Sequence, residues 1–159
     1  MNHHDAIAKV LRAGRSGTPR DLERAGTDIV NRLRLLLSTP GTGNLYTTLF
    51  FTTSTGRVVP YGSRVPHRAS APGQPPAPDT GRLRSSYGAS ASRIPDGAEL
   101  EVGSGLEYAP YLEFGTSQIE PRPHLRPAME QGKVTVRQEV GDGIVGREKA
   151  MARRLGGKG

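Results

Sequence analysis

One amphipathic segment constrains the fold more than any other part of the chain. Thr18 suits a helix N-cap and Pro19 the first helical position, and Ser38-Thr39-Pro40-Gly41 would end the helix. Between these signals, apolar side chains recur every three or four residues, as on one face of an α-helix: Leu22, Ala25, Ile29, Val30, Leu33, Leu36 and Leu37. The pattern predicts a helix over residues 18–38 whose single apolar face packs on a sheet or on another helix.

The segments on either side of this helix give weaker signals. The spacing of Ala6, Ile7, Val10 and Leu11 before Gly14 favours a short helix over residues 3–13. Residues 45–61 are rich in Thr, Phe, Tyr and Val around a Ser-Thr-Gly turn, which predicts a β-hairpin. Residues 62–81 hold five prolines and are expected to form a long extended loop.

The second half of the chain predicts another hairpin and a final helix. Residues 83–102 alternate around Pro95-Asp96-Gly97, a strong turn sequence. Pro110 disfavours a central strand over residues 108–115, where Gly115 can cap a short helical turn. A helix is expected beyond Pro127, weakened by Gly132, Gly141 and Gly143, and residues 153–159 are expected to be loose. The predicted class is α+β: an N-terminal helix, a small mostly antiparallel β-sheet with a long Pro-rich loop, and a C-terminal helix.

The apolar content allows only a small core. Leu, Ile, Val and Phe account for 32 of the 159 residues, close to the lower limit for a chain that folds alone. We therefore expect a single domain over residues 1–159 with its core at about 18–140 and an inserted hairpin and loop at 45–72. Residues 1–14 and 145–159 are expected to be arms that are loose or become ordered on partner chains.

Charge is arranged in blocks rather than spread evenly. The net charge is +7, yet residues 94–120 contain six acidic residues and no Lys or Arg. Residues 57–93 and 121–159 each have a net charge of +5. Opposite blocks on one chain suit a subunit whose acidic surface meets the basic surface of a neighbour, although ordinary solvated surface explains them equally well. A nucleic-acid binder would usually lack so acidic a middle block.

Several kinds of chemistry find no support in the sequence. The chain has no cysteine, and its four histidines lack metal-ligand spacing, so no metal site and no cofactor are expected. It contains no phosphate-binding loop, no nucleophile elbow and no zinc-protease motif, so we expect no catalytic residues and no enzymatic activity. No stretch approaches 18 apolar residues and no signal-peptide core is present. We therefore expect a soluble protein that is synthesised in a host cytoplasm and has no membrane partner.

Two segments carry a family resemblance. The first is the proline-rich run that leads into Asp79-Thr80-Gly81-Arg82-Leu83-Arg84-Ser85-Ser86. The second contains Tyr108-Ala109-Pro110-Tyr111-Leu112-Glu113-Phe114-Gly115-Thr116 and then Pro121-Arg122-Pro123-His124-Leu125-Arg126-Pro127-Ala128. In this order and spacing, the two closely resemble the tailed-phage tail-component family of neck, tail-completion and head–tail joining proteins. His124 departs from that family, which usually has Phe there, and we attribute the change to a less buried contact.

The resemblance implies a structural virion protein, a neck or tail-completion subunit between the head connector and the tail. Its implied partners are further copies of itself in a hexameric ring, the head connector or stopper, and the tail terminator or tail-tube protein. DNA in the channel is a further candidate contact. The alternatives are a tail terminator or tail-tube subunit, or a basic DNA-binding accessory protein.

The motif residues are the candidate site. They are expected to build the fold, and some of them to form contacts between subunits: Asp79, Thr80, Gly81, Arg82, Tyr108, Tyr111, Glu113, Phe114, Gly115, Arg122 and Arg126. Tyr108, Tyr111 and Phe114 would lie along one side of a helical turn and fill the core or an interface. Glu113 needs a partner if it is buried, and Arg122 or Arg126 is the expected one.

Overall fold

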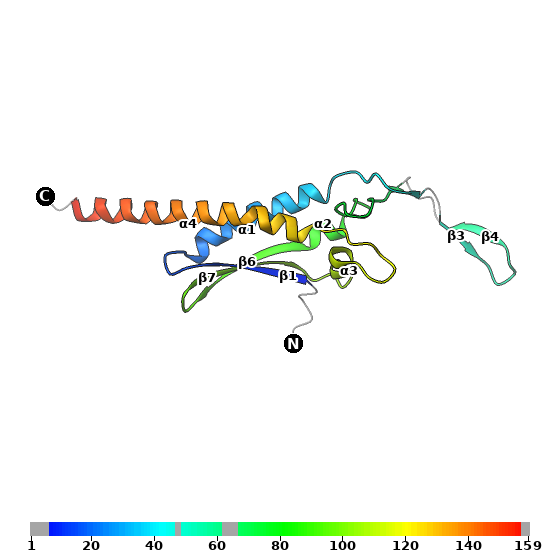
Figure 1. Cartoon of the computed structure of the whole chain (residues 1–159), viewed down its shortest axis with the longest axis horizontal. Helices are drawn as coiled ribbons and strands as arrows, with labels where there is room; N and C mark the ends of the chain where they lie inside the picture. The colour runs from blue at the N-terminus through cyan, green and yellow to red at the C-terminus, as the bar shows by residue number, and fades with distance from the viewer. Residues whose placement is uncertain (1–6, 47–48, 62–66, 157–159) are drawn as a thin grey trace.

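The computed structural model describes residues 7–46, 49–61 and 67–156, and its class is α+β as predicted. Figure 1 shows an elongated molecule with the hairpin β3–β4 at one end and the C-terminal end of α4 at the other. The elements are β1 (Ile7–Ala13), α1 (Pro19–Leu36), β2 (Leu45–Tyr46), β3 (Leu49–Thr52), β4 (Val58–Tyr61), β5 (His67–Arg68), α2 (Arg82–Ser86), β6 (Tyr87–Ile94), β7 (Gly97–Ser104), α3 (Ala109–Phe114) and α4 (Leu125–Gly156).

A three-stranded antiparallel sheet forms one layer, in the order β1-β7-β6. The β6–β7 hairpin and its turn at residues 95–97 confirm the second predicted hairpin, with Tyr87 paired with Ser104 and Ile94 with Gly97. On β7, Ala98, Leu100 and Val102 are fully buried beneath the helices, while Glu99 and Glu101 alternate with them on the outer face.

The helix expected over residues 3–13 is wrong, because residues 7–13 form strand β1. Every residue of β1 pairs with β7, from Ile7 opposite Ser104 to Ala13 opposite Ala98. The segment IAKVLRA has no regular alternation of apolar and polar residues, and seven residues are too few to decide between strand and helix by pattern. The long-range pairing decides, so this part of the expected N-terminal arm is a strand of the sheet.

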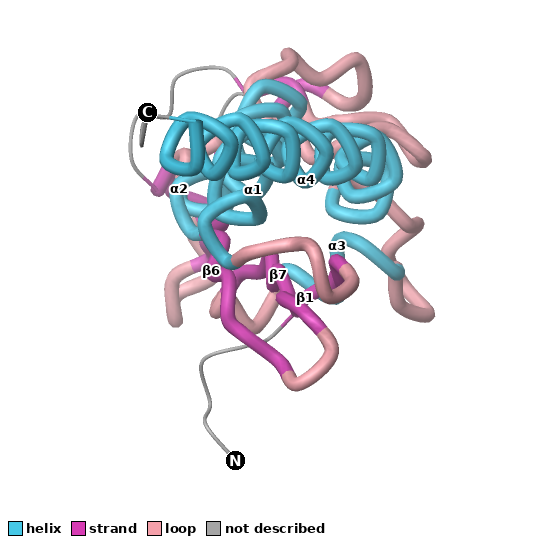
Figure 2. Tube along the Cα trace, turned by 90° about the vertical axis from the view of Figure 1, so that its left-hand side faces the viewer, coloured by secondary structure: helices cyan, strands magenta, loops and turns pink. Residues whose placement is uncertain are grey.

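Helix α1 covers the inner face of the sheet, which confirms the prediction for its apolar face. Thr18 and Asp21 form a capping box in which each side chain accepts the other residue's backbone N–H. At Gly26 a Cβ atom would lie 2.7 Å from Leu100 and 2.9 Å from the Cβ of Ala89. The helix therefore rests almost directly on strands β6 and β7 (Figure 2).

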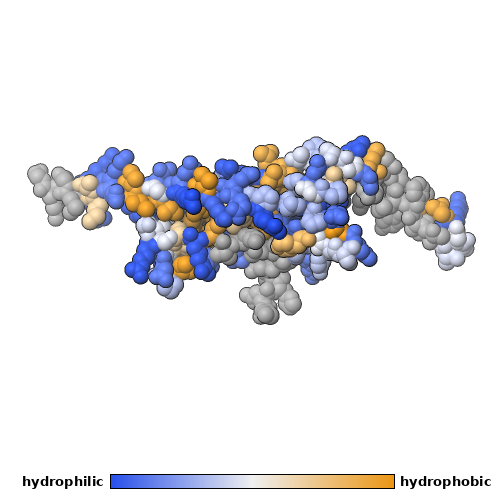
Figure 3. Space-filling model, in the orientation of Figure 1, coloured by the Kyte–Doolittle hydropathy of each residue, from blue (hydrophilic) through white to orange (hydrophobic). Residues whose placement is uncertain are grey.

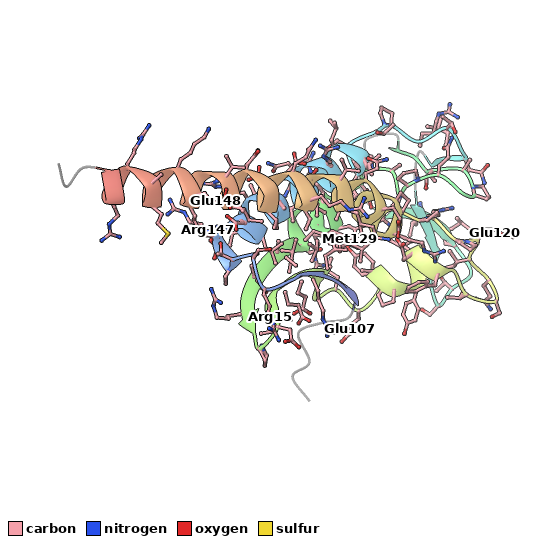
Figure 4. The ribbon with its side chains drawn as sticks, turned by 60° about the vertical axis from the view of Figure 1, so that its left-hand side comes forward. Arg15, Glu107, Glu120, Met129, Arg147 and Glu148 are labelled. Carbon is pink, nitrogen blue, oxygen red and sulfur yellow. The ribbon has the colours of Figure 1, made fainter. Side chains whose placement is uncertain are left out.

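Helix α4 lies across α1 and continues to Gly156, well beyond the predicted core. Its glycines act as contact points: a Cβ at Gly132 would collide with Ile29, and one at Gly143 with the Asp21 carboxylate. Arg147, labelled in Figure 4, then donates to Asp21 Oδ2 at 2.9 Å and to the Ser16 carbonyl at 2.6 Å. Residues 145–156 are thus helical rather than loose.

The remaining strands agree with the predictions only in part. β3 and β4 pair as the predicted hairpin, but β2 pairs with β5 instead of joining it. Residues 82–86, expected to begin a strand, form the short helix α2 instead. The Ser85 and Ser86 hydroxyls donate to the carbonyls of Arg82 and Leu83, side-chain bonds that favour this local turn over an extended chain.

Candidate functional site

The buried carboxylate of Glu113 joins α3 to the beginning of α4. Its Oε2 accepts the backbone N–H groups of His124 at 2.8 Å and Leu125 at 2.9 Å, and its Oε1 accepts that of Arg126 at 2.9 Å. The first N–H groups of a helix lack partners within the helix, and the positive end of the helix dipole favours an anion. Glu113 therefore supplies the N-terminal cap of α4. The expectation that a guanidinium of Arg122 or Arg126 pairs with it is wrong.

His124 is fully buried, so its replacement of Phe does not reflect a less buried contact. Its Nδ1 lies 2.9 Å from the Arg122 carbonyl and 3.1 Å from Glu113 Oε2, and both of these oxygens can only accept. Nδ1 therefore carries the proton, and Nε2 accepts from the Tyr87 hydroxyl at 2.7 Å. Burial lowers the pKa of His124, although the Arg122 carbonyl and the charge of Glu113 act in the opposite direction.

Tyr87 completes this buried group from the first residue of β6. Its ring meets the His124 ring edge-on, with centroids 5.6 Å apart. Burial, then the charges of Glu113 and Tyr108, raise the pKa of Tyr87, which keeps its hydroxyl protonated as a donor. The side chains of Tyr87, His124 and Glu113 at the junction of the sheet, α3 and α4 are thus all hydrogen-bonded.

The Asp79-Thr80-Gly81 segment turns the chain into α2, where the sequence predicted the start of a strand. Gly81 adopts φ +76°, the left-handed region that glycine enters freely, and its carbonyl accepts the Ser85 N–H at 3.0 Å. Arg84 donates to the Ser38 hydroxyl at 3.0 Å, which ties α2 to the residues after α1. The motif therefore fixes the end of the proline-rich loop to the body.

This turn forms one wall of a hollow of about 240 Å³. The lining brings together motif residues from both segments with the end of α1: Asp79, Thr80, Gly81, Arg82, Tyr108 and Arg122, beside Leu37, Ser70, Pro76, Ala77, Pro78, Leu83, Arg84 and Leu112. Sequence reasoning missed Ser70 and Leu37, because only the folded loop brings them to the motif. The Ser70 hydroxyl and the Arg122 Nε are buried without a hydrogen-bond partner among the described residues.

The aromatic residues of the second motif point outwards. Tyr108, Tyr111 and Phe114 are 40%, 56% and 52% exposed, so of the two predicted roles the core is wrong. Gly115, at φ +76°, turns the chain, and the Arg122 N–H then donates to the Leu112 carbonyl at 2.7 Å. Together with the 40% exposed Ile119, these three aromatic side chains form an apolar surface around α3 that we call the α3 patch.

Charged residues border the α3 patch. The Arg126 guanidinium lies 5.8 Å from the centroid of the Phe114 ring, a cation–π distance. Glu107 and Glu120 are exposed just before and after α3, and Figure 4 shows Glu120 on the outer loop. An apolar centre with a charged rim is the composition of a protein–protein contact surface. Elsewhere the face in Figure 3 is largely hydrophilic, with some apolar surface along α4. Val134, Val145 and Met151 of that helix are exposed.

The described residues contain no group of three or more His, Cys, Asp or Glu that could hold a metal ion. Within the same residues, no helix is long and apolar enough to cross a membrane.

Residues 65–115 match a family model. It is that of the HK97-gp10-like family, described as "Bacteriophage HK97-gp10, putative tail-component". The match confirms the resemblance to a phage tail component. It includes Asp79, Gly81, Tyr108, Glu113 and Gly115, whereas Arg122 and Arg126 lie beyond it. A search of the curated proteins found no match, and neither did a search of the solved structures.

Proposed function

We propose that this protein is a non-enzymatic neck or tail-completion subunit of a tailed-phage virion, which joins the head connector to the tail. The match of residues 65–115 to a phage tail-component family carries this proposal. That family match supports a tail component in general, and the finer position in the particle is our inference from the surfaces of the molecule.

Two structural features support an assembly role. The α3 patch exposes three aromatic rings that the fold itself leaves unburied, and large exposed apolar groups with a polar rim mark contact surfaces. The molecule also extends two projections in opposite directions, the β3–β4 hairpin and the C-terminal end of α4 (Figure 1). Such projections suit a subunit that reaches over its neighbours, and we propose that the copies form a ring, as a hexamer.

The proposed neighbours are the head connector or stopper on one side and the tail terminator or tail tube on the other. The α3 patch and its rim residues, Arg122 and Arg126 included, would contact the adjacent chains. Exposed cations on the far end of α4, Lys149, Arg153 and Arg154 among them, would face DNA in the channel or acidic surfaces of a neighbour.

Electron microscopy of particles made without this gene tests the proposal. DNA-filled heads beside separate tails of normal length are expected, and a plasmid copy of the gene should restore whole particles. Tails of uncontrolled length would instead assign the protein to tail termination. Normal infectious particles would overturn the structural role, and salt-sensitive DNA binding by the isolated protein would then favour the accessory function.

A further inference from the structure

The three-stranded sheet has two edges, β1 and β6, and no other described strand pairs with either. They contain seven and eight residues. An edge strand presents a row of unpaired backbone N–H and C=O groups, and monomeric proteins usually block such an edge with proline, charge, a bulge or short length.

Strand β6 lacks these blocking features. Its sequence, YGASASRI, has no proline and a single charge, Arg93, close to its end. Its residues pair one to one with β7 along the whole strand, which leaves no bulge. Gly88, Ala89 and Ser90 are exposed, although α1 packs on β6 and its Arg34 donates to the Tyr87 carbonyl at 3.5 Å.

The outer face beside this edge is equally unobstructed. Gly88, Ser90 and Gly103 line a shallow hollow of about 300 Å³ whose one charged side chain is that of Glu101. A Cβ atom placed on Gly88 would meet no atom within 4 Å. An incoming strand with ordinary side chains therefore fits against β6 from Gly88 onward, while the Arg34 guanidinium at the Tyr87 carbonyl would have to move to extend the pairing to Tyr87.

We infer that β6 of one copy pairs with β1 of the next copy, so that neighbouring subunits share a continuous sheet. The inference rests on the proposed ring. β6 and β1 are the opposite edges of one sheet and have nearly equal length, and of the two edges β1 carries the more charge, from Lys9 and Arg12. Pairing two different edges is a heterologous contact, which closes into a ring where the rotation between copies allows it and gives an open filament where it does not.

The direction of the shared pairing follows from the strand count. Three alternating antiparallel strands leave β1 and β6 of one copy running the same way. In the proposed ring of six, neighbours are related by a rotation of about 60°, which is too small to reverse a strand. The joint between β6 and the next β1 is therefore parallel. A twofold dimer would instead pair β6 with β6 in antiparallel fashion.

The chain contains no cysteine, so introduced thiols can report this joint directly. Ser92, Glu99 and Arg12 lie in one row across the sheet, and Arg12 is thus the residue that an unshifted joint places opposite Ser92. The test combines Arg12→Cys with Ser92→Cys, Ser90→Cys or Gly88→Cys, which covers shifts of two and four residues on the same face. Each single variant is the matched control.

Mild oxidation should give a ladder of dimers, trimers and larger species for at least one double variant, both in purified protein and in particles. The single variants should stay monomeric. Dimers from a β6 cysteine alone, without larger species, would overturn the inference in favour of a twofold joint. Particles that assemble normally but give no ladder with any pair would overturn it while leaving the neck function intact.

A second pair of variants tests the same edge without oxidation. Ser90→Lys with Ser92→Lys places two charges on β6 and should abolish self-association in analytical ultracentrifugation while thermal unfolding is unchanged. Gln138→Lys, on an exposed part of α4, adds a charge elsewhere and should leave association intact. Undiminished association of the β6 variant would contradict the joint. Failure of the proposed neck function is a separate outcome, because it would be seen as normal infectious particles made without the gene.

Discussion

Glu113 on α3 accepts the backbone N–H of Leu125, the first residue of α4, at 2.9 Å. One carboxylate thus fixes the angle between the short helix that displays the aromatic surface and the long helix that crosses the body. The same carboxylate also accepts the N–H groups of His124 and Arg126. The position of the α3 patch therefore depends on a buried cap rather than on contacts made by the patch itself.

Glu113→Ala should destabilise the protein by roughly 2–4 kcal/mol, because it leaves three N–H groups at the start of α4 without their acceptor in a buried site. Urea unfolding measures the change. The matched control is Glu107→Ala, which removes an exposed carboxylate two residues before α3 and should change stability by about 0.5 kcal/mol or less. Equal effects of the two substitutions would show that Glu113 does not cap the helix.

Stability should decrease as the pH falls below the ordinary histidine pKa of 6.5. Burial lowers the pKa of His124 in the folded protein, so below 6.5 the unfolded chain binds more protons and is favoured. The contribution is fully present above pH 6.5 and is lost as the pH falls toward the folded-state pKa. Unfolding midpoints measured between pH 8 and pH 5 should show this slope in the wild type, and it should be absent from His124→Phe.

His124→Phe should also cost about 1–3 kcal/mol at pH 8, since it leaves the buried Tyr87 hydroxyl without its acceptor. Adding Tyr87→Phe removes that hydroxyl and should recover much of the loss, so that the double variant is more stable than His124→Phe. A double variant that is less stable than the single one would contradict the assigned hydrogen bond. The control is Tyr111→Phe, which removes an exposed hydroxyl and should have little effect.

Two glycines of α4 should respond in opposite ways to alanine. Gly141→Ala meets no atom within 4 Å and should stabilise the helix by about 0.5–1 kcal/mol, the difference in helix propensity. Gly132→Ala would collide with the fully buried Ile29 and should destabilise by roughly 1 kcal/mol or more despite the same propensity gain. Thermal unfolding of both variants checks the prediction. A stabilised Gly132→Ala would show that α1 and α4 are less closely packed.

Tyr111→Ser combined with Phe114→Ser should reduce infectious titre strongly while leaving the unfolding temperature close to that of the wild type. Both rings are more than half exposed, so they contribute little to the fold, whereas the proposed contact of the α3 patch with adjacent chains buries them. Complementation of the disabled gene provides the measurement, with unjoined heads and tails counted by electron microscopy. The control is Val134→Ser, which changes an apolar residue of similar exposure on α4. Normal joining by the double variant would exclude the α3 patch as the contact.

The elements predicted correctly from the sequence are those whose determining residues lie within the element itself. Helix α1 has its cap, its proline and its apolar face within 21 consecutive residues, and the β6–β7 hairpin follows from one turn. Strand β1 could not be predicted from its own sequence, because its partner strand β7 lies more than 80 residues away. The family motifs located the α3 region, and the match of residues 65–115 confirms the family that they resemble.

The roles of single site residues depended on contacts that a sequence does not display. Glu113 was expected to pair with an arginine, yet its acceptors face the backbone of residues 124–126, which the next helix brings to it. His124 was expected to be less buried, yet Tyr87, 37 residues earlier, supplies the donor that makes a buried imidazole acceptable. The aromatic spacing predicted a shared side of α3 but could not show whether that side faces the core.

Among the side chains that the structure describes, Arg147 is the last of α4 to hydrogen-bond to the body. The nine residues from 148 to 156 continue the helix for roughly 13 Å beyond it. A peptide of that length would seldom be helical alone, because starting a helix is the unfavourable step. Here the anchored part has already started it, so each further turn only has to propagate. A partner that binds this end would meet a helix that is already formed, so residues 148–156 would lose little conformational entropy on binding.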